Sequence, residues 1–546
     1  MSYTAEDLIK EQQQLESNRG HWETHWQEIA ERVLPRASEF NRSESKGTKR
    51  TEKVFDSTAC LALERSAAAM ESMLTPRAQK WHNLRATNED VNKDREASLW
   101  LEEVNKLLFQ YRYQSRANFA SQKHEDFLQL MAFGTSTMFV DALDAGGIRY
   151  RTVHLAETYL AENHQGIVDT YYRKFKMSAH QAQTKPQWQG TLPERIAKAT
   201  NPHEEFEFLH CVKPRMDIDP NRRDARGMPW VSIYVSMEGR QILSEGGYRS
   251  FPYSVSRYVT AARETYGRSP AMTVLPDIKM LNEMAKTDIR AVHKLVDPPL
   301  LLHNDGILGG GSMGVNMRPN GLNYGGVNAD GRQLIQPLST GARVDIAEEK
   351  MEQKRRTIND AFLVTLFQIL VENPQMTATE AMLRAQEKGA LLSPAMGRQQ
   401  SESLGPMIER ELDILQTQGL LPEMPPVLIE AQGEYDIVYD SPLSRLQRAE
   451  EVTGIGRTLE MIAPFAQYDP SVLDVFDPHE IARITAEVNG VPTMALRSRE
   501  QFEQMMASKQ EAESMQNMAQ TAQPAANAIM NVAQAQALMN GAQGTA

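Results

Sequence analysis

The sequence predicts a predominantly helical α+β protein built from several sub-structures. Long stretches place apolar residues at helical spacing, whereas residues 135–262 alternate apolar and polar side chains with the period of two that is typical of strands. Further along, two helices of similar length flank an insert rich in Gly and Asn. Because 546 residues are too many for one hydrophobic core, we expect two to four sub-structures.

The first predicted helix follows Thr4, which with Asp7 forms a start resembling a capping box, and it ends before Pro35. Apolar residues recur along it every seven positions: Leu8, Leu15, Trp22 and Ile29. This narrow seam predicts packing against one neighbouring helix or subunit. A basic, serine-rich loop over residues 41–50 follows.

Two more helical stretches, residues 56–74 and a broken pair over residues 94–133, precede the β region. Inside that region we expect mostly antiparallel strands with short helices inserted. The strands are predicted at residues 137–141, 148–153, 167–175, 205–212, 230–235 and 253–259. Turn residues at 164–166 and 237–239 indicate hairpins.

The next predicted helix starts with Ser269 as N-cap and Pro270 at the first helical position, and Asp-Pro-Pro at residues 297–299 ends it. Such a helix spans about 40 Å at 1.5 Å per residue. A second helix of similar length covers residues 344–371 and is broken at Asn373-Pro374. The segment between the two, residues 298–343, is long and lacks helix signals, which is typical of a functional or disordered loop.

From residue 377 onward, the sequence mainly predicts helices. Thr377 opens a helix to about residue 392 with a capping box, and residues 401–418 predict another helix closed by Gly419. A strand at residues 434–439 precedes helical signals that continue to about residue 510. The last segment, residues 511–546, is biased toward Ala, Gln, Met and Asn, so we expect it to be disordered or helical only in an assembly.

Composition excludes several classes of protein. A static duplex binder usually carries a basic excess, but this chain has 59 Lys and Arg against 71 Asp and Glu, a net charge of −12. Such a balance suits DNA that must slide, although acidity more often serves solubility. Two cysteines exclude a disulfide scaffold, and no Cys/His cluster has zinc spacing, so we expect no metal and no cofactor. No apolar run predicts a membrane span or a signal peptide.

The glycine run at residues 309–314 matches two catalytic patterns without the context that either requires. It fits G-x-G-x-x-G, but the following residues 315–319 cannot form the helix that holds a pyrophosphate. It also places Ser312 in G-x-S-x-G, but the next His is His479, far downstream. A flexible glycine loop is the preferred interpretation of both matches.

Two histidines, His21 and His25, are spaced as in a zincin, but Glu23 stands one position away from where that motif has its general base. Ser43 and Lys46 match S-x-x-K without its partner motifs, and no P-loop is present. We therefore interpret these residues as parts of solvent-facing segments.

A cluster of basic residues lies on the second long helix: Lys350, Lys354, Arg355 and Arg356. The plainer interpretation is a solvated face balanced by nearby acids, with Glu352 and Arg356 spaced i, i+4. The alternative is contact with phosphates.

Seven blocks of sequence together resemble the head-to-tail connecting, or portal, proteins of podoviruses, the short-tailed bacteriophages. They are VFDSTA (54–59), LTPRAQKW (74–81), FGTSTMFV (133–140), YGRSPAMTVLPDIKMLNEM (266–284), VDPPL (296–300), MTATEAMLRAQEK (376–388) and SPLSRLQRAEE (441–451). No block is a catalytic motif, but their order and spacing are specific. The resemblance extends from about residue 5 to residue 510.

The resemblance implies a portal fold, assembled as a ring of twelve subunits around a channel. Its parts would be a wing (1–268), a first stem helix (269–296), a clip (297–343), a second stem helix (344–371), a tunnel loop (372–378), a helical return to the wing (379–440), a helical crown (441–510) and a C-terminal tail (511–546).

The resemblance also implies a function: a non-enzymatic portal subunit at one capsid vertex of the virion, assembled in the host cytoplasm. Its partners would be further copies of itself, double-stranded genomic DNA passing through, the terminase, tail adaptor proteins, and the major capsid and scaffolding proteins. The DNA-channel candidates are Lys350, Lys354, Arg355, Arg356, Asn373, Gln375 and Met376. The candidates for partner binding by the clip are Asp305, Asn316, Arg318, Asn320, Asn323, Tyr324 and Arg332.

Two other classes of protein remain as alternatives from the residues alone. An internal helical virion or scaffold protein without a channel would suit the biased tail, but the paired long helices around a Gly/Asn insert argue against it. A hydrolase that uses Ser312 stays open only because its motif is present.

Overall fold

The structure is a computed structural model, and the chain divides into two compact units. The first comprises Met1–His82, Lys106–Leu421 and Tyr439–Leu443, and the second comprises Asn83–Asn105, Pro422–Val438 and Ser444–Ala546. The structure describes residues 3–41, 45, 47–219, 221–222, 224–296, 300–302, 327, 330–333, 335–337, 344–364, 394–431, 434–439, 442–466, 475–488, 491, 495–497, 501–502, 504–509, 511–512, 530 and 533. Its mixture of helices and sheets confirms the predicted α+β class.

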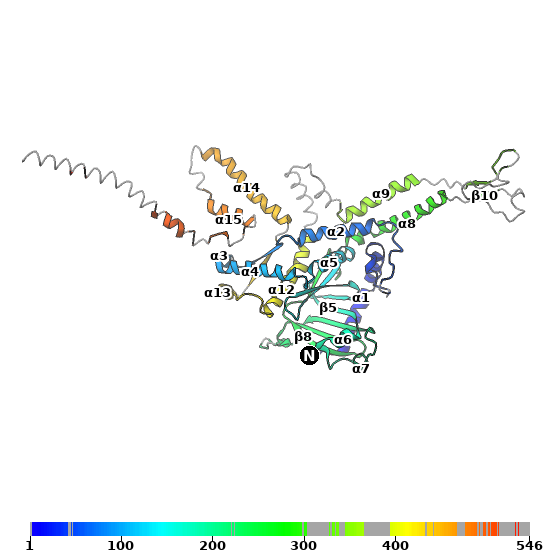
Figure 1. Cartoon of the computed structure of the whole chain (residues 1–546), viewed down its shortest axis with the longest axis horizontal. Coiled ribbons are helices and arrows are strands. Elements are labelled where there is room, and N and C mark those ends of the chain that lie inside the picture. The colour runs from blue at the N-terminus through cyan, green and yellow to red at the C-terminus, as the bar shows by residue number, and fades with distance from the viewer. Residues whose placement is uncertain are drawn as a thin grey trace, which may run out of the picture. The chain divides into compact units, whose positions relative to one another are not determined.

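The first unit contains most of the described elements (Figure 1). Its helices are α1 (Ala5–Val33), α2 (Thr58–Leu74), the C-terminal part of α4 (Arg95–Arg112), α5 (Phe119–Phe133), α6 (Ala179–Thr184), α7 (Glu194–Ala197), α8 (Pro270–Val296), α9 (Val344–Ala361), the π-helix η5 (Gln399–Leu404) and α12 (Gly405–Thr417). Its strands are β2 (Thr135–Ala142), β3 (Ile148–Val153), β4 (Thr158–Glu162), β5 (Val168–Ser178), β6 (Glu205–Pro214), β7 (Trp230–Ser236), β8 (Gln241–Tyr248), β9 (Tyr253–Arg257), β10 (Leu300–Leu302) and β11 (Ile335–Pro337).

Two antiparallel sheets form the body of this unit. One has the order β4-β5-β6-β7-β8 and the other the order β3-β2-β9. Six of these strands agree with the prediction, and the hairpin expected at residues 164–166 connects β4 to β5, where Gly166 supplies a φ of 78°. The prediction missed β4 and β8.

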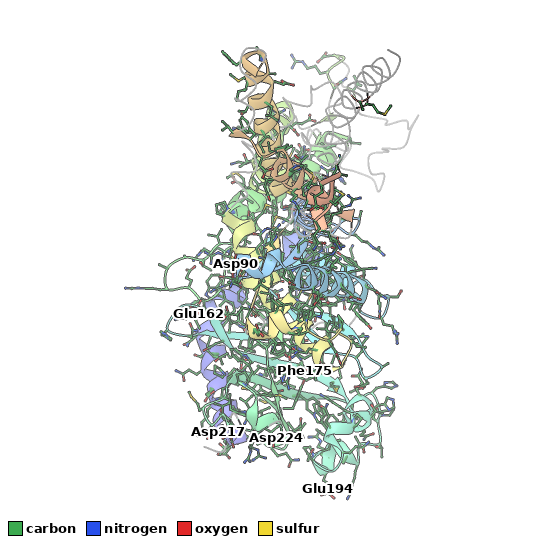
Figure 2. All side chains as sticks on the ribbon, turned by 90° about the vertical axis from the view of Figure 1, so that its left-hand side faces the viewer. Asp90, Glu162, Phe175, Glu194, Asp217 and Asp224 are labelled. Atoms are coloured by element: carbon green, nitrogen blue, oxygen red, sulfur yellow. The ribbon has the colours of Figure 1, made fainter. Side chains whose placement is uncertain are left out.

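The loop between β6 and β7 carries Asp217 and Asp224 at the same end of the unit as Glu194 of α7 (Figure 2).

Helices cover both faces of the five-stranded sheet. The start of α1 packs on one face, where Leu8 and Ile9 join a buried cluster with Tyr172, Leu209 and Ile233. The opposite face is covered by α6, α7 and the 3-10 turn between them, through a second cluster: Phe175, Ala179, Ala182, Trp188, Ile196, Phe206, Phe208 and Leu243. Burial of apolar surface on both faces is the main stabilising contribution to such a layered body.

The start and end of α1 are as predicted, because the Thr4 side chain accepts a hydrogen bond from the backbone N–H of Asp7 and the helix stops at Val33. The prediction that its apolar seam meets one neighbouring helix or subunit is wrong. The first half of α1 packs on the five-stranded sheet, and the second half packs on α2, α5 and α8 of the same chain. The apolar residues of α1 therefore pack against other parts of the same subunit, and Trp26, beside the seam, is fully buried.

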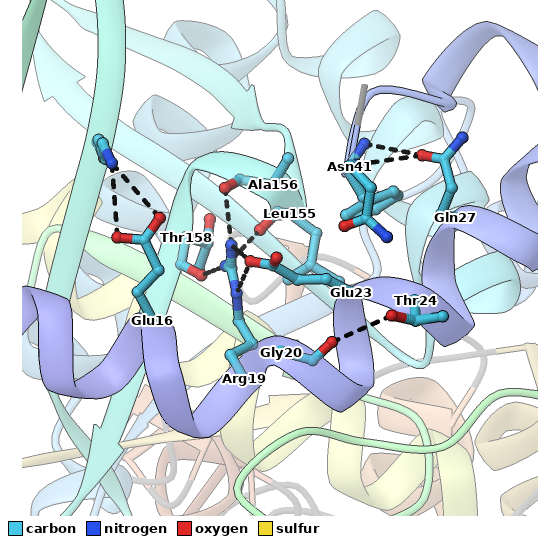
Figure 3. A network of polar contacts seen from close by, with 12 residues as sticks. Glu16, Arg19, Gly20, Glu23, Thr24, Gln27, Asn41, Leu155, Ala156 and Thr158 are labelled. Atoms are coloured by element: carbon cyan, nitrogen blue, oxygen red, sulfur yellow. Dashed lines mark hydrogen bonds and ion pairs between the residues drawn. The ribbon is translucent and has the colours of Figure 1, made fainter. Parts of the chain in front are cut away.

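A buried arginine attaches the middle of α1 to the body (Figure 3). Arg19 donates hydrogen bonds to the carbonyl oxygens of Leu155 and Ala156, in a short 3-10 turn, and of Thr158, which follows that turn. It is also paired with Glu23, one helical turn away, at 2.6 Å. Its guanidinium also lies 3.9 Å from the centroid of the Tyr159 ring. Since a buried arginine needs all its donors satisfied, this arrangement fixes the register of α1 on the sheet.

Groups of the same chain occupy the outer backbone positions of the edge strands. On β4 the Leu160 N–H donates to the Tyr266 hydroxyl, and on β3 the Thr152 N–H donates to the Gln122 side chain at 2.6 Å. On β8 the Leu243 carbonyl accepts from Thr191, and on β9 the Arg257 carbonyl accepts from Gln399. Both sheets therefore end in strands whose outer edges carry hydrogen bonds within the subunit.

The root of α8 is fixed by a close crossing of two backbones. Gly134, with a φ of 76°, follows α5, and Gly267 precedes α8; a Cβ on either glycine would collide with the carbonyl oxygen of the other. Next to this crossing, the Ser269 hydroxyl donates to the Ala132 carbonyl and accepts from the N–H of Met272, as expected of the predicted N-cap. The start of α8 is thus anchored to the end of α5.

The described part of the second unit is helical apart from one strand pair. It contains most of β1 (His82–Ala86), α3 (Glu89–Lys93), the first part of α4, α13 (Pro426–Glu430), most of β12 (Tyr435–Tyr439), α14 (Pro442–Ala466) and α15 (Pro478–Val488). Strand β1 pairs with β12, and the Asn92 side chain binds both backbone groups of Ala86. The strand β12 and the helices after residue 441 were predicted, whereas β1 and α3 were not.

Candidate functional site

The α8–α9 hairpin is the part of the first unit that the sequence singles out. The two helices run side by side (Figure 1), joined by an ion pair of 2.6 Å between Asp277 of α8 and Lys354 of α9. Beyond α8, strand β10 pairs antiparallel with β11, with Leu302 opposite Ile335. The chain therefore leaves and re-enters the hairpin at one place, and the insert between residues 302 and 335 is connected to it through two adjacent strands.

A loop before α2 contacts both helices of the hairpin. On the α8 side, the Asn282 side chain accepts hydrogen bonds from the N–H groups of Phe55 and Asp56, at 2.7 and 3.1 Å, and donates to the Ile278 carbonyl. On the α9 side, Asp56 accepts two hydrogen bonds from Arg355, at 2.9 and 3.0 Å. We call Asp56, Asn282 and Arg355 the clamp, because together they hold both helices to one loop of the body.

In the clamp, Asp56 and Arg355 each stabilise the charged form of the other. Partial burial raises the pKa of Asp56, but hydrogen bonds from Thr58 and Arg355 outweigh it and hold the pKa below its ordinary value. Burial lowers the pKa of Arg355 while Asp56 and Glu352 raise it, with a net rise. The pair is therefore ionised at neutral pH, and charge-assisted bonds of this kind are stronger than neutral ones.

The predicted basic cluster separates into two pairs. Lys354 and Arg355 point toward the body and pair with Asp277 and Asp56. Lys350 and Arg356 are exposed, and Arg356 has Glu352 at 3.5 Å one turn away, as the i, i+4 spacing predicts. Of these four cations, Lys350 and Arg356 are therefore the two whose side chains are exposed.

The remaining predicted site residues lie mostly outside the part of the chain that the structure describes. Arg332 is described and exposed next to β11. The other clip candidates are not: Asp305, Asn316, Arg318, Asn320, Asn323 and Tyr324. The same holds for Asn373, Gln375 and Met376, for the capping box at Thr377, for Ser312 and for most of the C-terminal tail.

The end predicted for the second long helix is wrong. It starts at Val344 as expected, but α9 ends at Ala361 and not at residue 371. Phe362 and Leu363 form a turn, and Leu363 adopts a φ of 57°, which an α-helix cannot continue through. Phe362 and Val364 stay buried on either side of this turn, and residues 365–371 lie outside the part of the chain that the structure describes.

The residues that sequence reasoning missed are Asp56, Asp277 and Asn282. Asp56 is the first residue of one predicted helix, and Asp277 and Asn282 lie inside another, where polar residues give no sign of a contact with the rest of the chain. All three lie inside the blocks VFDSTA and YGRSPAMTVLPDIKMLNEM that carry the resemblance. The only signal for the clamp was therefore the occurrence of polar residues in those blocks.

Among the described residues, no three or more His, Cys, Asp and Glu side chains are grouped as metal ligands. Within the same residues, none of the helices combines the length and apolar character needed to cross a bilayer.

Comparison of the whole sequence with known proteins defines the class to which this chain belongs. The chain belongs to the family of bacteriophage head to tail connecting proteins, whose sequence model matches residues 5–496. The family predicted from the sequence is thereby confirmed, and the protein functions as a portal, or head-to-tail connector.

Individual relatives cover most of the chain. It is 28% identical over 493 residues to the probable portal protein of Bordetella phage BPP-1, covering 89% of this chain and 87% of the relative. It is 27% identical over 525 residues to the portal protein of Salmonella phage epsilon15, covering 91% and 90%. A solved chain from the virion of a native gene transfer agent particle aligns with 12% identity and a TM-score of 0.33, over 78% of this chain and 94% of that one.

Proposed function

We propose that twelve copies of this chain form a ring at one capsid vertex, around a channel through which genomic DNA enters during packaging and leaves at infection. The α8–α9 hairpin carries this proposal. The clamp ties this hairpin to the body, and the hairpin continues through β10 and β11 toward the insert. In a ring, twelve such hairpins would make the stem wall, and the inserts would make the clip.

The wall of this channel would be only weakly attractive to DNA. The exposed cations Lys350 and Arg356 are few, Arg356 has Glu352 one turn away, and the chain as a whole has a net charge of −12. Acidic groups repel phosphates, and a few exchangeable cations provide contacts that break easily as the duplex moves. Of the four stem cations predicted to line the channel, we therefore retain Lys350 and Arg356, because Lys354 and Arg355 hold the subunit together.

The remaining predicted segments complete the proposal. Asn373, Gln375 and Met376 would form a tunnel loop that touches DNA without strong charge. The clip residues, including the exposed Arg332, would dock the terminase first and the tail adaptors afterwards. Capsid and scaffolding proteins would surround the wing. No covalent chemistry is assigned to the subunit.

The mass and shape of the purified assembly test the proposal. Twelve subunits of 61.5 kDa each give about 738 kDa, and native mass spectrometry should find that species or one differing by a single subunit. Projection images should show a ring with a central opening. A stable monomer or dimer at micromolar concentration would contradict the ring and would favour an internal virion protein without a channel.

A substitution separates the conduit from the hydrolase alternative. Ser312→Ala should leave ring mass and packaging unchanged, because Ser312 belongs to a loop without catalytic partners in sequence. Loss of a measurable hydrolase activity in this variant would show that the conduit describes only part of the function.

A further inference from the structure

The apolar stripe of α8 continues beyond the body that covers its first part. Ile278, Leu281 and Ala285 are buried on this stripe. At the same helical spacing the stripe continues through Ile289, Val292 and Val296, whose side chains are 47%, 39% and 81% exposed. Three apolar residues in line at the outer end of a helix, exposed in the subunit, indicate a surface that is covered in an assembly.

A basic flank borders this stripe. Lys286, Arg290 and Lys294 follow one another at intervals of four residues, so they lie along one side of the last turns of α8. Arg290 and Lys294 are exposed, and neither has an ion pair with any described residue. Lys286 is close to Glu283 and to the Phe55 ring. The outer end of α8 thus combines apolar and positively charged surface.

The first turns of α9 carry the opposite charge. Glu348, Glu349 and Glu352 are exposed there, and Asp360 is exposed further along the helix. The buried face of α9, with Met351 and Ile358, is turned toward the body and α8 of its own chain. Because the acidic residues are at other positions around the helix, they face outward, away from the α8 to which this α9 is paired.

Two complementary surfaces on one hairpin that cannot meet within a subunit can meet between subunits. A contact of two different surfaces is heterologous, and it generates a closed ring when the rotation between copies closes. A two-fold dimer would instead bring each surface against itself, with like charges facing each other. The charge pattern of the hairpin therefore favours a ring over a dimer.

We propose that the exposed stripe and basic flank of α8 bind the outward acidic face of α9 on the next copy of this chain. This inference rests on the proposed ring and names the surfaces that build it. The apolar residues of the stripe supply buried area, while Arg290 and Lys294 opposite Glu348 and Glu349 set the orientation of neighbouring copies. The competing occupant of the basic flank is a DNA phosphate backbone.

Charge reversal on one surface at a time tests the pairing. One variant carries Arg290→Glu with Lys294→Glu, and the other carries Glu348→Lys with Glu349→Lys. Each puts like charges across the contact, so the subunit concentration needed for half-maximal ring formation should rise about tenfold or more. Native mass spectrometry over a dilution series measures it. A matched control with Lys176→Glu and Lys198→Glu, two exposed cations elsewhere in the first unit, should assemble as the unchanged chain does.

Mixing the two variants is the sharpest arm of the test. In a ring that alternates the two, every reversed α8 meets a reversed α9, and every unchanged α8 meets an unchanged α9. Two preparations that assemble poorly alone should therefore assemble together, to within about threefold of the unchanged chain. The combined four-substitution variant should also assemble. Urea midpoints equal to that of the control variant verify that each subunit is folded.

The outcomes separate this inference from the proposed function. If the unchanged chain forms no ring, the proposed function fails. If it forms a ring and both variants assemble normally, the proposed ring is supported and the assigned surfaces are wrong.

Three further outcomes would overturn the pairing of α8 with α9. The first is weak assembly of the two variants that mixing them does not restore. A normal ring in the Arg290→Glu, Lys294→Glu variant with a changed amount of packaged DNA assigns the flank to DNA and overturns the inference. If a charge-reversed variant unfolds while the control variant stays folded, these residues do not lie on an exposed surface, and the inference is overturned.

Discussion

Asp56 connects two helices that are far apart in sequence, since it caps the start of α2 through the Thr58 N–H and pairs with Arg355 of α9. Asp56→Asn keeps an oxygen for the cap but removes the charge. We expect the free energy of unfolding at pH 7 to fall by about 1 kcal/mol, because Arg355 is 34% exposed and solvent screens the pair. Urea denaturation measures it. Asp144→Asn, at an exposed position between β2 and β3, is the matched control and should leave the free energy of unfolding unchanged.

The same pair gives a defined pH dependence. The pKa of Asp56 is lower in the folded chain than its ordinary value, so the unfolded chain takes up a proton first as the pH falls. The stabilisation is therefore complete above about pH 4, the ordinary range of an Asp, and is lost as the pH falls through the lower folded value. The difference in unfolding free energy between the unchanged chain and Asp56→Asn should shrink below about pH 4. A difference that stays constant to pH 2.5 would contradict the assignment.

Glu411 neutralises the charge of Arg112, which solvent cannot reach. Arg112 and Glu411 are both fully buried and joined by two hydrogen bonds, of 3.1 and 2.5 Å, and the Tyr150 hydroxyl also donates to Glu411. Glu411→Gln leaves the Arg112 charge buried without its counter-ion, so the free energy of unfolding should fall by about 3–5 kcal/mol. Glu194→Gln breaks the exposed pair with Lys198 and should cost less than about 0.5 kcal/mol. If the two substitutions lowered the free energy of unfolding equally, burial of the ion pair would not determine how much stability its loss removes.

These residue-level contacts were not predictable from the sequence. Arg112 with Glu411, and Arg355 with Asp56, are each separated by 299 positions. No helical or strand period relates residues so far apart, and each charge alone reads as part of a solvated face. The i, i+4 pair of Glu352 and Arg356 was predictable because both residues lie on one helix.

At the scale of elements, the crossing of Gly134 and Gly267 sets the origin of α8. Gly134→Ala adds a Cβ against the carbonyl of Gly267 and requires a residue with a side chain to keep a φ of 76°. We expect the free energy of unfolding to fall by at least about 2 kcal/mol. Gly20→Ala, in the exposed middle of α1 where a Cβ meets nothing, should raise it by about 0.5–1 kcal/mol. Calorimetry of both variants measures the contrast; equal and small effects would show that α8 does not depend on the crossing.

Elements with strong local signals were predictable, and those without them were not. Capping residues fixed the starts of α1 and α8, and alternation located six strands. Strand β4 is only five residues long, and β8 contains Gly246 and Gly247, which lower its strand signal. Their places in the sheet come from pairing with β5 and β7, which is tertiary information. The end of α9 was missed because Leu363 adopts a φ of 57°, a backbone conformation that the apolar pattern around it does not indicate.

For the whole molecule, the pairing of β10 with β11 allows the insert to be removed cleanly. Leu302 lies opposite Ile335, so an Asn-Gly turn can replace residues 303–334 and close a short hairpin. We expect this variant to form a ring of correspondingly lower mass and to lose binding of the terminase and of tail adaptors. Native mass spectrometry and co-sedimentation with each purified partner measure the two properties. Retained binding would place the docking surface elsewhere, and loss of the ring would show that the insert also joins subunits.

The occupied sheet edges have a consequence for subunits that wait to assemble. An open edge strand offers a template onto which another chain can add, and newly made subunits at high concentration would stick together through it irreversibly. Here Tyr266, Gln122, Thr191 and Gln399 already bind outer backbone groups of β4, β3, β8 and β9. Uncontrolled strand addition is thereby discouraged, so encounters between free subunits are left to side-chain surfaces, whose weaker contacts can dissociate and correct a misplaced neighbour.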